Sequence, residues 1–268
     1  MIDLHTHVLP GLDDGAQSLE EALAMVRVAL ADGVSCLVAT PHDTGFAPYD
    51  IGKVKAVTAQ LQKAIGIYGL SLCVVVGSEL YAVPDLAQRL RAGECLTLGG
   101  SQYPLLEFPL MDLPLCTEQL LFELRVAGFR PIIAHPARNE VFRRDPNRLC
   151  ELIEKGALAQ LTASALTGHF GKSVQEAAYV FLEHNLVHFL ASDAHDPEHR
   201  PPRLSEGVAR AAEIIGGEKA KAMVTTRPQA VLADERLDIG SPRRYRPRRY
   251  WLWPRWMRSG RNKGARAI

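Results

Sequence analysis

The sequence predicts an α/β fold in which parallel strands form a TIM-like barrel. Short runs rich in β-branched residues alternate with segments whose apolar residues recur at helical spacing, in repeats of about 30 residues. Such repeats imply parallel strands joined by right-handed crossovers. Six or seven of them favour a barrel over an open doubly wound sheet, and no Gly-x-Gly-x-x-Gly or Walker loop is present. The length of 268 residues suits one large domain.

The predicted elements follow one another in a regular order. Strands are expected in the apolar runs at 2–4, 34–40, 72–77, 103–108, 130–135 and 187–193. The first helix is the best marked, because Ser18 as N-cap and Glu21 form a capping box and Gly33 ends the segment. Its apolar residues keep helical spacing: Leu19, Leu23, Val26 and Leu30. Further helices are expected near 51–66, 116–127, 146–155, 172–184 and 203–215.

The composition limits the class of protein. No apolar run approaches the roughly 18 residues of a membrane-spanning helix, and the first residues lack the features of a secretory signal, so we expect a cytoplasmic protein. The cysteines show no Cys-x-x-Cys spacing, as is typical of thiols in a reducing compartment. None is followed by arginine six positions later, which excludes the loop of cysteine-dependent phosphatases: Cys36, Cys73, Cys95, Cys116 and Cys150.

Charge divides the chain into two parts. Residues 241–268 carry ten Lys or Arg and no acidic residue, whereas residues 1–240 have 21 basic against 30 acidic residues, a formal charge of −9. The basic part also holds all three tryptophans and is expected to be disordered in isolation. An anionic membrane surface is its favoured partner, which would place the protein at the inner face of the membrane. A protein partner is the next alternative, and nucleic acid is the least favoured.

Histidine, aspartate or glutamate follows almost every predicted strand. His5 and His7 alone are weak evidence for a metal, although side chains two apart on a strand point the same way. The carboxyl ends of barrel strands meet at one face, and six such ends with these residues predict a metal site there. Either Asp13 or Asp14 could serve as a ligand, and only the family resemblance given below favours Asp14. The candidate ligands are His5, His7, Asp14, His42, Glu79, Glu107, His135, Asp193 and His195.

This ligand set points to hydrolysis. Five imidazoles and four carboxylates without a thiolate suit Zn, Mn or Fe, and nine ligands require two or three ions. Closely spaced ions that hold a hydroxide are suited to phosphoester cleavage, with amide hydrolysis or deamination as the alternative. Arg138 and Arg200 follow metal ligands closely and favour a phosphate ester, because guanidinium binds phosphate through two hydrogen bonds.

The motifs together resemble the polymerase and histidinol phosphatase (PHP) superfamily. Within it, the sequence is similar to the bacterial protein-tyrosine phosphatases of capsular and exopolysaccharide synthesis. The resemblance runs from residue 1 to about 235, so we expect a phosphatase domain at 1–235 and a basic, Trp-rich tail at 236–268. The matching stretches are DLHTHVLPGLDDG, ATPH, GSELY, PLLEFP, IIAHPAR, QLTASALTGHFG, and FLASDAH followed by RPP.

The resemblance implies a distorted seven-stranded barrel with three metal ions, manganese being favoured over iron or zinc. One ion would be held by His5, His7 and Asp193, and Glu79 would bridge it to a second. The second would be held by Glu107 and His135, and the third by Asp14, His42 and His195. Arg138 and Arg200 match the family's phosphate-binding arginines, and a metal-bound hydroxide would be the nucleophile.

The implied substrate is phosphotyrosine on a membrane-associated tyrosine kinase that regulates polysaccharide export. Two alternatives stay open: a phosphatase of a small phosphomonoester such as histidinol phosphate, and a non-enzymatic scaffold. His199 or Asp196 could act as a general acid, although a role in a solvated loop is favoured for both. The sequence also leaves an oligomer open.

Overall fold

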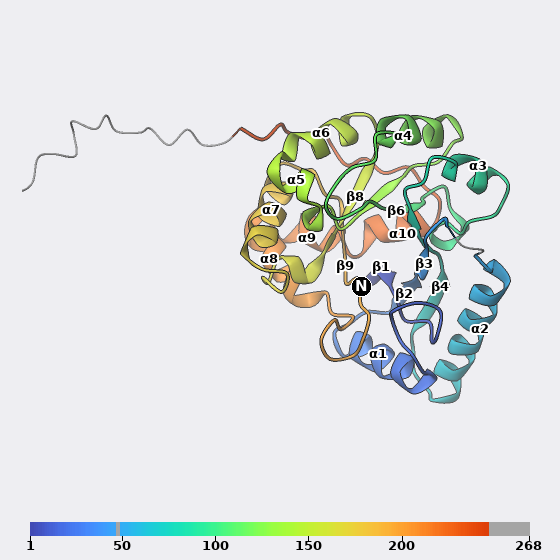
Figure 1. Cartoon of the computed structure of the whole chain (residues 1–268). Coiled ribbons are helices and arrows are strands. Elements are labelled where there is room, and N and C mark those ends of the chain that lie inside the picture. Colours follow the sequence, from blue (N-terminus) through green and yellow to red (C-terminus); the bar gives the residue numbers. More distant parts are fainter. Residues whose placement is uncertain (47–48, 247–268) are drawn as a thin grey trace, which may run out of the picture.

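The computed structural model describes residues 1–46 and 49–246 and shows strands surrounded by helices (Figure 1). The strands are β1 (Ile2–Thr6), β2 (Cys36–Ala39), β3 (His42–Asp43), β4 (Cys73–Val76), β5 (Glu79–Tyr81), β6 (Leu105–Glu107), β7 (Ile132–Ala134), β8 (Leu158–Thr162) and β9 (Phe189–Ala191). The α-helices are α1 (Leu19–Ala31), α2 (Ile51–Ile67), α3 (Leu86–Arg91), α4 (Thr117–Val126), α5 (Glu140–Arg144), α6 (Pro146–Glu154), α7 (Lys172–Glu183), α8 (Ser205–Ile215), α9 (Gly217–Ala222) and α10 (Thr226–Leu232).

All strand pairs are parallel, as the alternating pattern predicts. One sheet has the order β1-β2-β4 and the other the order β3-β5-β6-β7-β8-β9. The predicted strands at 34–40 and 72–77 correspond to β2 and β4, and each is followed by a second short strand, β3 or β5, that was not predicted. Pro41, which has no N–H for a ladder, separates β2 from β3, and Gly77 lies between β4 and β5. The strands of the described residues therefore occupy seven positions.

The two sheets are connected where β1 lies beside the end of β9. Thr6 and Ala194 form a bridge, the Asp193 N–H donates to the His5 carbonyl at 2.9 Å, and the His7 N–H donates to the Ala194 carbonyl at 2.8 Å. β1 carries one extra residue relative to β2 between Asp3 and Thr6, a β-bulge at the position of His5. These contacts bring residues about 190 positions apart into register.

The helices confirm the predicted pattern where it is strongest. The Glu21 N–H donates to the Ser18 side chain at 3.2 Å, and the Glu21 carboxylate accepts from the Gln17 N–H at 2.7 Å, so α1 begins with the predicted cap. All six predicted helices are present. The short helices α3, α5, α9 and α10 were not predicted, because fewer than eight residues give little periodicity to detect.

The C-terminal segment, residues 236–246, runs along the body of the molecule. Ile239 packs against a core cluster that includes Phe189, and the Tyr245 N–H donates to the Asn147 side chain at 2.8 Å. The predicted boundary at 235 stays a prediction. The rest of the tail, residues 247–268 with its tryptophans, lies outside the described residues. Within residues 1–46 and 49–246, no helix has the length and apolarity needed to span a membrane.

Candidate metal centre

One buried carboxylate, Glu79 at the start of β5, lies at the centre of the site. Its Oε2 is 3.1 Å from His5 Nε2, 3.4 Å from His7 Nε2 and 3.2 Å from His42 Nδ1. Its Oε1 is 2.8 Å from His135 Nε2. A carboxylate that faces four imidazoles from three strands or their ends, β1, β3 and β7, has the position of a bridging ligand.

A fully buried group lies where β1 meets the end of β9. His5 Nε2 and His7 Nε2 are 3.1 Å apart, and each is 3.6 Å from Asp193 Oδ1. Two ring nitrogens this close leave room for a shared cation between them and the carboxylate. This group reproduces the first predicted ligand set.

A second group opens toward solvent. Asp14 Oδ1 lies 3.4 Å from both His42 Nε2 and His195 Nε2, as the third predicted set requires. Glu107 is 3.5 Å from His42 Nδ1 and 3.8 Å from His135 Nε2. Its position is compatible with the predicted second set, although Glu107 lies nearer to His42 than to His135, and His42, Glu79 and Glu107 form the group of close ligand atoms.

The structure thus brings together every candidate ligand that the sequence predicts. Each lies within 3.8 Å of at least one other member. The donor atoms are imidazole nitrogens and carboxylate oxygens, which fit divalent Mn, Fe or Zn. The residues present therefore suit a centre of several divalent ions.

The backbone is strained at two of these ligands. His135 after β7 has a φ of 32° and Asp193 after β9 a φ of 54°, both in the left-handed region that non-glycine residues seldom adopt. Strain of this kind persists only where surrounding structure imposes it, and it concentrates at functional sites. Gly15 allows the chain to pass close to His7 at the same face. Any other residue is excluded there, because its Cβ would lie 1.9 Å from the His7 carbonyl oxygen.

Two polar side chains orient the histidines from behind. Asp13 Oδ2 is 2.7 Å from His7 Nδ1, and Gln160 Oε1 is 2.9 Å from His5 Nδ1. Each acceptor fixes the proton on Nδ1, so that Nε2 presents its lone pair to the centre. The geometry therefore favours Asp14 as the ligand and Asp13 as the residue that orients His7. The sequence analysis missed Gln160, whose only signal is a polar residue within a buried strand.

The electrostatics of the centre call for positive charge. Burial opposes a charge on His7, but hydrogen bonds to Asp13 and Glu79 raise its pKa to about 10. Burial also opposes a charge on Glu79, yet the surrounding imidazoles, His5 foremost, hold the pKa of this carboxyl well below its usual range. Protons and divalent cations compete for such sites, so the arrangement fits bound metal ions.

The two predicted arginines converge on Asp193. Arg138 Nη1 donates to Asp193 Oδ2 at 2.8 Å, and Arg200 Nη2 is 2.9 Å from Asp193 Oδ1. Arg138 also lies over the Phe170 ring at 5.1 Å. Both guanidinium groups are about a quarter exposed, so they border the centre and remain accessible to a ligand.

The two residues considered as general acids, His199 and Asp196, lie in the loop beside Arg200. Ser164, His169 and His199 line a cavity of about 240 Å³ beside Arg200. Asp196 accepts backbone N–H groups from Glu198, His199 and Arg200, which is a loop-forming role. Thr162 Oγ1 is buried and has no partner among the residues that the structure describes.

Comparison with known proteins gives consistent results. The family model for capsular polysaccharide synthesis, CpsB/CapC, matches residues 1–233. The tyrosine-protein phosphatase YwqE of Bacillus subtilis is 36% identical over 81% of this chain and 86% of its own length. The putative tyrosine-protein phosphatase CapC of Staphylococcus aureus is 38% identical over 77% of this chain and 81% of its own.

Solved structures agree with these relatives. A chain from crystal structures of YwqE from Bacillus subtilis and CpsB from Streptococcus pneumoniae, described as metal-dependent tyrosine phosphatases, superposes with a TM-score of 0.88 and 34% identity. It covers 92% of this chain and 100% of that one. A dihydropyrimidinase from Brevibacillus agri, at 11% identity, a TM-score of 0.53 and coverage of 90% of this chain and 73% of its own, shares the fold alone.

Proposed function

The chain belongs to the CpsB/CapC family of capsular polysaccharide synthesis proteins, and we propose that it is a metal-dependent tyrosine-protein phosphatase. The observation that carries this proposal is Glu79 held against four imidazoles, with Arg138 and Arg200 at the border of the same centre. Relatives named tyrosine-protein phosphatases support it. The reaction is hydrolysis of a phosphoric monoester, without a cysteine nucleophile.

The nine ligands named above would hold divalent ions, three per chain with manganese favoured. When bound, such ions lower the pKa of water and stabilise charge on phosphoryl oxygens. The chain itself supplies the orientation of the ligands, through Asp13 and Gln160. Burial of the Glu79 and Asp193 side chains keeps bulk water from competing with these contacts.

Arg138 and Arg200 would bind the phosphoryl oxygens of the substrate. Asp193 holds both guanidinium groups at the edge of the centre from the same side. Fixed donors of this kind stabilise the charge that spreads over the equatorial oxygens in phosphoryl transfer. We assign them phosphate binding for this reason.

Aromatic side chains beside the centre suit a phosphotyrosine ring. Tyr81 stands opposite Glu107 in the β5–β6 register, and its ring centroid is 5.8 Å from that of Phe46. Phe46 is 79% exposed and therefore accessible to an aromatic ring that enters the centre. A phenolate with a pKa near 10 leaves without strong acid assistance, so the exposed His199 need not act as a general acid.

The test is a phosphate-release assay with a phosphotyrosine peptide and histidinol phosphate as parallel substrates. We expect release from the peptide that is lost when metal is removed and returns when Mn²⁺ is added. If histidinol phosphate is hydrolysed faster than the peptide, the small-molecule alternative is correct and this proposal is wrong. No turnover of either substrate by the metal-loaded protein would contradict phosphatase activity altogether.

The partner follows from the family. We propose that the substrate is a tyrosine kinase of capsular or exopolysaccharide synthesis, and that residues 241–268 bring the enzyme to the anionic inner face of the membrane. Ten basic residues and three tryptophans in this segment support the second part. A chain truncated after Arg246 should lose flotation with anionic liposomes. Unchanged flotation would exclude membrane anchoring by the tail.

A further inference from the structure

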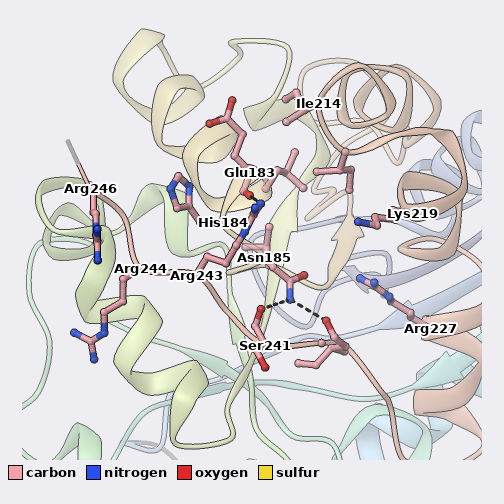
Figure 2. A pocket seen from close by; sticks show the side chains of 15 residues that line it. Glu183, His184, Asn185, Ile214, Lys219, Arg227, Ser241, Arg243, Arg244 and Arg246 are labelled. Carbon is pink, nitrogen blue, oxygen red and sulfur yellow. Dashed lines mark hydrogen bonds between the residues drawn. The ribbon is translucent and has the colours of Figure 1, made fainter. Parts of the chain in front are cut away.

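A second large cavity lies at the face opposite the metal centre. It has a volume of about 960 Å³ and is bordered by the ends of α7 and α8, by α9 and α10, and by residues 239–246 (Figure 2). Val187, two residues before β9, lines it, whereas Asp193 of the metal centre lies two residues after β9. At the rise of an extended strand this separates the two sites by about 20 Å.

The cavity, called the basic groove below, is lined by cations. Lys219 and Arg227 extend into it from one side and Arg243 from the other, as Figure 2 shows. Arg246 borders it farther along the C-terminal segment. Glu183 is the one acidic residue of the lining, and it is exposed. The groove therefore has an excess of positive charge in a chain whose first 240 residues are formally negative.

The charges of the basic groove lack internal partners. In the part of the chain that the structure describes, Lys219, Arg227, Arg243 and Arg246 form no ion pair, whereas Arg244 is paired with Glu154 at 2.8 Å. Arg227 is half-buried and donates to the His188 carbonyl at 2.9 Å. Burial lowers its pKa, and no carboxylate nearby offsets this. Lys219, Arg243 and Arg246 are exposed to solvent, so Arg227 is the cation that an external anion would stabilise most.

The walls between the cations are apolar. Leu182, Ile214 and Ile215 line the basic groove, and Ile239 closes it from the C-terminal segment. A simple inorganic anion would use only the cations and leave most of the volume unfilled. An anion with an organic carrier would contact both kinds of surface.

We propose that the basic groove binds the phosphate group of a phosphate ester, with the organic part of the ligand against the apolar wall. Arg227 and Arg243 supply planar donors suited to phosphate oxygens, and Lys219 supplies a third charge. The ligand is either the headgroup of an anionic phospholipid or a soluble phosphate compound. This site is independent of the phosphatase reaction.

The test compares two charge reversals on the same helix in the full chain. Lys219→Glu places a negative charge in the basic groove, while Lys221→Glu makes the same change on α9 outside it. Both side chains are exposed, so neither change should disturb folding. The probes are vesicles of phosphatidylglycerol, vesicles of phosphatidylcholine, and inorganic pyrophosphate measured by calorimetry.

We expect Lys219→Glu to weaken binding of phosphatidylglycerol vesicles or of pyrophosphate about tenfold or more, and Lys221→Glu to change it less than about twofold. A loss confined to the vesicles identifies a lipid headgroup, and a loss confined to pyrophosphate identifies a soluble ligand. Equal effects of the two variants, or no binding by the wild type, would overturn the proposal. Phosphotyrosine hydrolysis should be unchanged in both variants, so the outcome is separate from that of the proposed function.

Discussion

The two faces of the strand assembly differ in charge, in burial and in the parts of the sequence that form them. At the carboxyl ends, imidazoles and carboxylates from the whole length between His5 and His195 converge in a largely buried centre that calls for cations. At the amino end beside β9, an open groove is lined by Lys219, Arg227, Arg243 and Arg246, which form no ion pair among the described residues and favour an anion. The same strands support both faces, yet only one of them is built from distant parts of the sequence.

This difference shows what each face requires of the fold. Parallel strands bring their carboxyl ends together automatically, so ligands placed at those ends converge wherever they occur in the chain. The basic groove instead depends on short helices and on a C-terminal segment that folds back over them. Substitutions at the first face should therefore alter chemistry, and substitutions at the second should alter binding or stability.

The largest effect is expected from Glu79→Gln, which keeps the shape of the side chain and removes its charge. Four imidazoles would lose their shared carboxylate, so hydrolysis of a phosphotyrosine peptide should fall by at least about a thousandfold. Metal analysis should show fewer ions per chain. Glu118→Gln on α4, in an exposed pair with Lys155, is the matched control and should retain activity. Full activity of Glu79→Gln would contradict a bridging role.

A smaller loss is expected when the arginines change to lysine. Arg138→Lys and Arg200→Lys keep the charge but lose the planar fork, and kcat/KM should fall about 10- to 100-fold. Metal content should stay at the wild-type level, which separates this effect from that of Glu79→Gln. Arg144→Lys, at a side chain that is 78% exposed, is the control. Equal activity in all three variants would exclude phosphate binding by Arg138 and Arg200.

The orienting residues should produce a loss that added metal repairs. Asp13→Asn and Gln160→Leu leave every predicted ligand in place but release the Nδ1 side of His7 and His5. Metal affinity should fall about 10- to 100-fold. Activity measured against Mn²⁺ concentration should recover at saturation in these variants, and it should not recover in Glu79→Gln. A defect that saturating metal leaves unchanged would show that Asp13 or Gln160 has another role.

The clustering of the nine candidate ligands could be predicted from the sequence, because each strand end can be recognised separately. Every candidate ligand sits at or just after an apolar run, and parallel strands bring their carboxyl ends to one face. The Asp13–Asp14 question could not be answered in the same way, because the direction of two adjacent loop side chains depends on contacts such as the close approach of Gly15 to His7. Gln160 was invisible for a similar reason, since its role depends on which nitrogen of His5 faces it.

The opposite face was not predictable from the chain. Lys219 and Arg227 lie in helices of six and seven residues, which are too short for a periodic signal. Their proximity to Arg243 depends on hydrogen bonds that hold the C-terminal segment against α7, such as the Arg243 N–H to the His184 carbonyl at 2.8 Å. The short strands β3 and β5, after Pro41 and Gly77, were also not predicted, because two or three residues give no apolar pattern to detect.

The smallest effect concerns stability at the amino-end face and appears only in acid. His188 is fully buried, and burial together with the charge of Arg227 lowers its pKa to about 3. The unfolded chain binds a proton at this residue below a pKa of about 6.5 and the folded chain does not, so folding stability should fall as the pH drops from about 6.5 toward 3. Between pH 7 and pH 5 the expected loss is about 2 kcal/mol.

His188→Asn tests this contribution, because its amide oxygen can still accept from the Ala159 N–H that His188 Nδ1 binds at 3.1 Å. The variant should lose about 2 kcal/mol less than the wild type between pH 7 and pH 5, measured by urea unfolding at each pH. The ionisable groups of the metal centre are the same in both proteins, so their contribution to the pH dependence of stability cancels in the difference. His199→Asn, at a side chain that is 85% exposed, should behave like the wild type. If His188→Asn loses as much folding stability between pH 7 and pH 5 as the wild type, the acid sensitivity arises at the carboxyl-end face. The amino-end face would then contribute to binding and not to the pH dependence of stability.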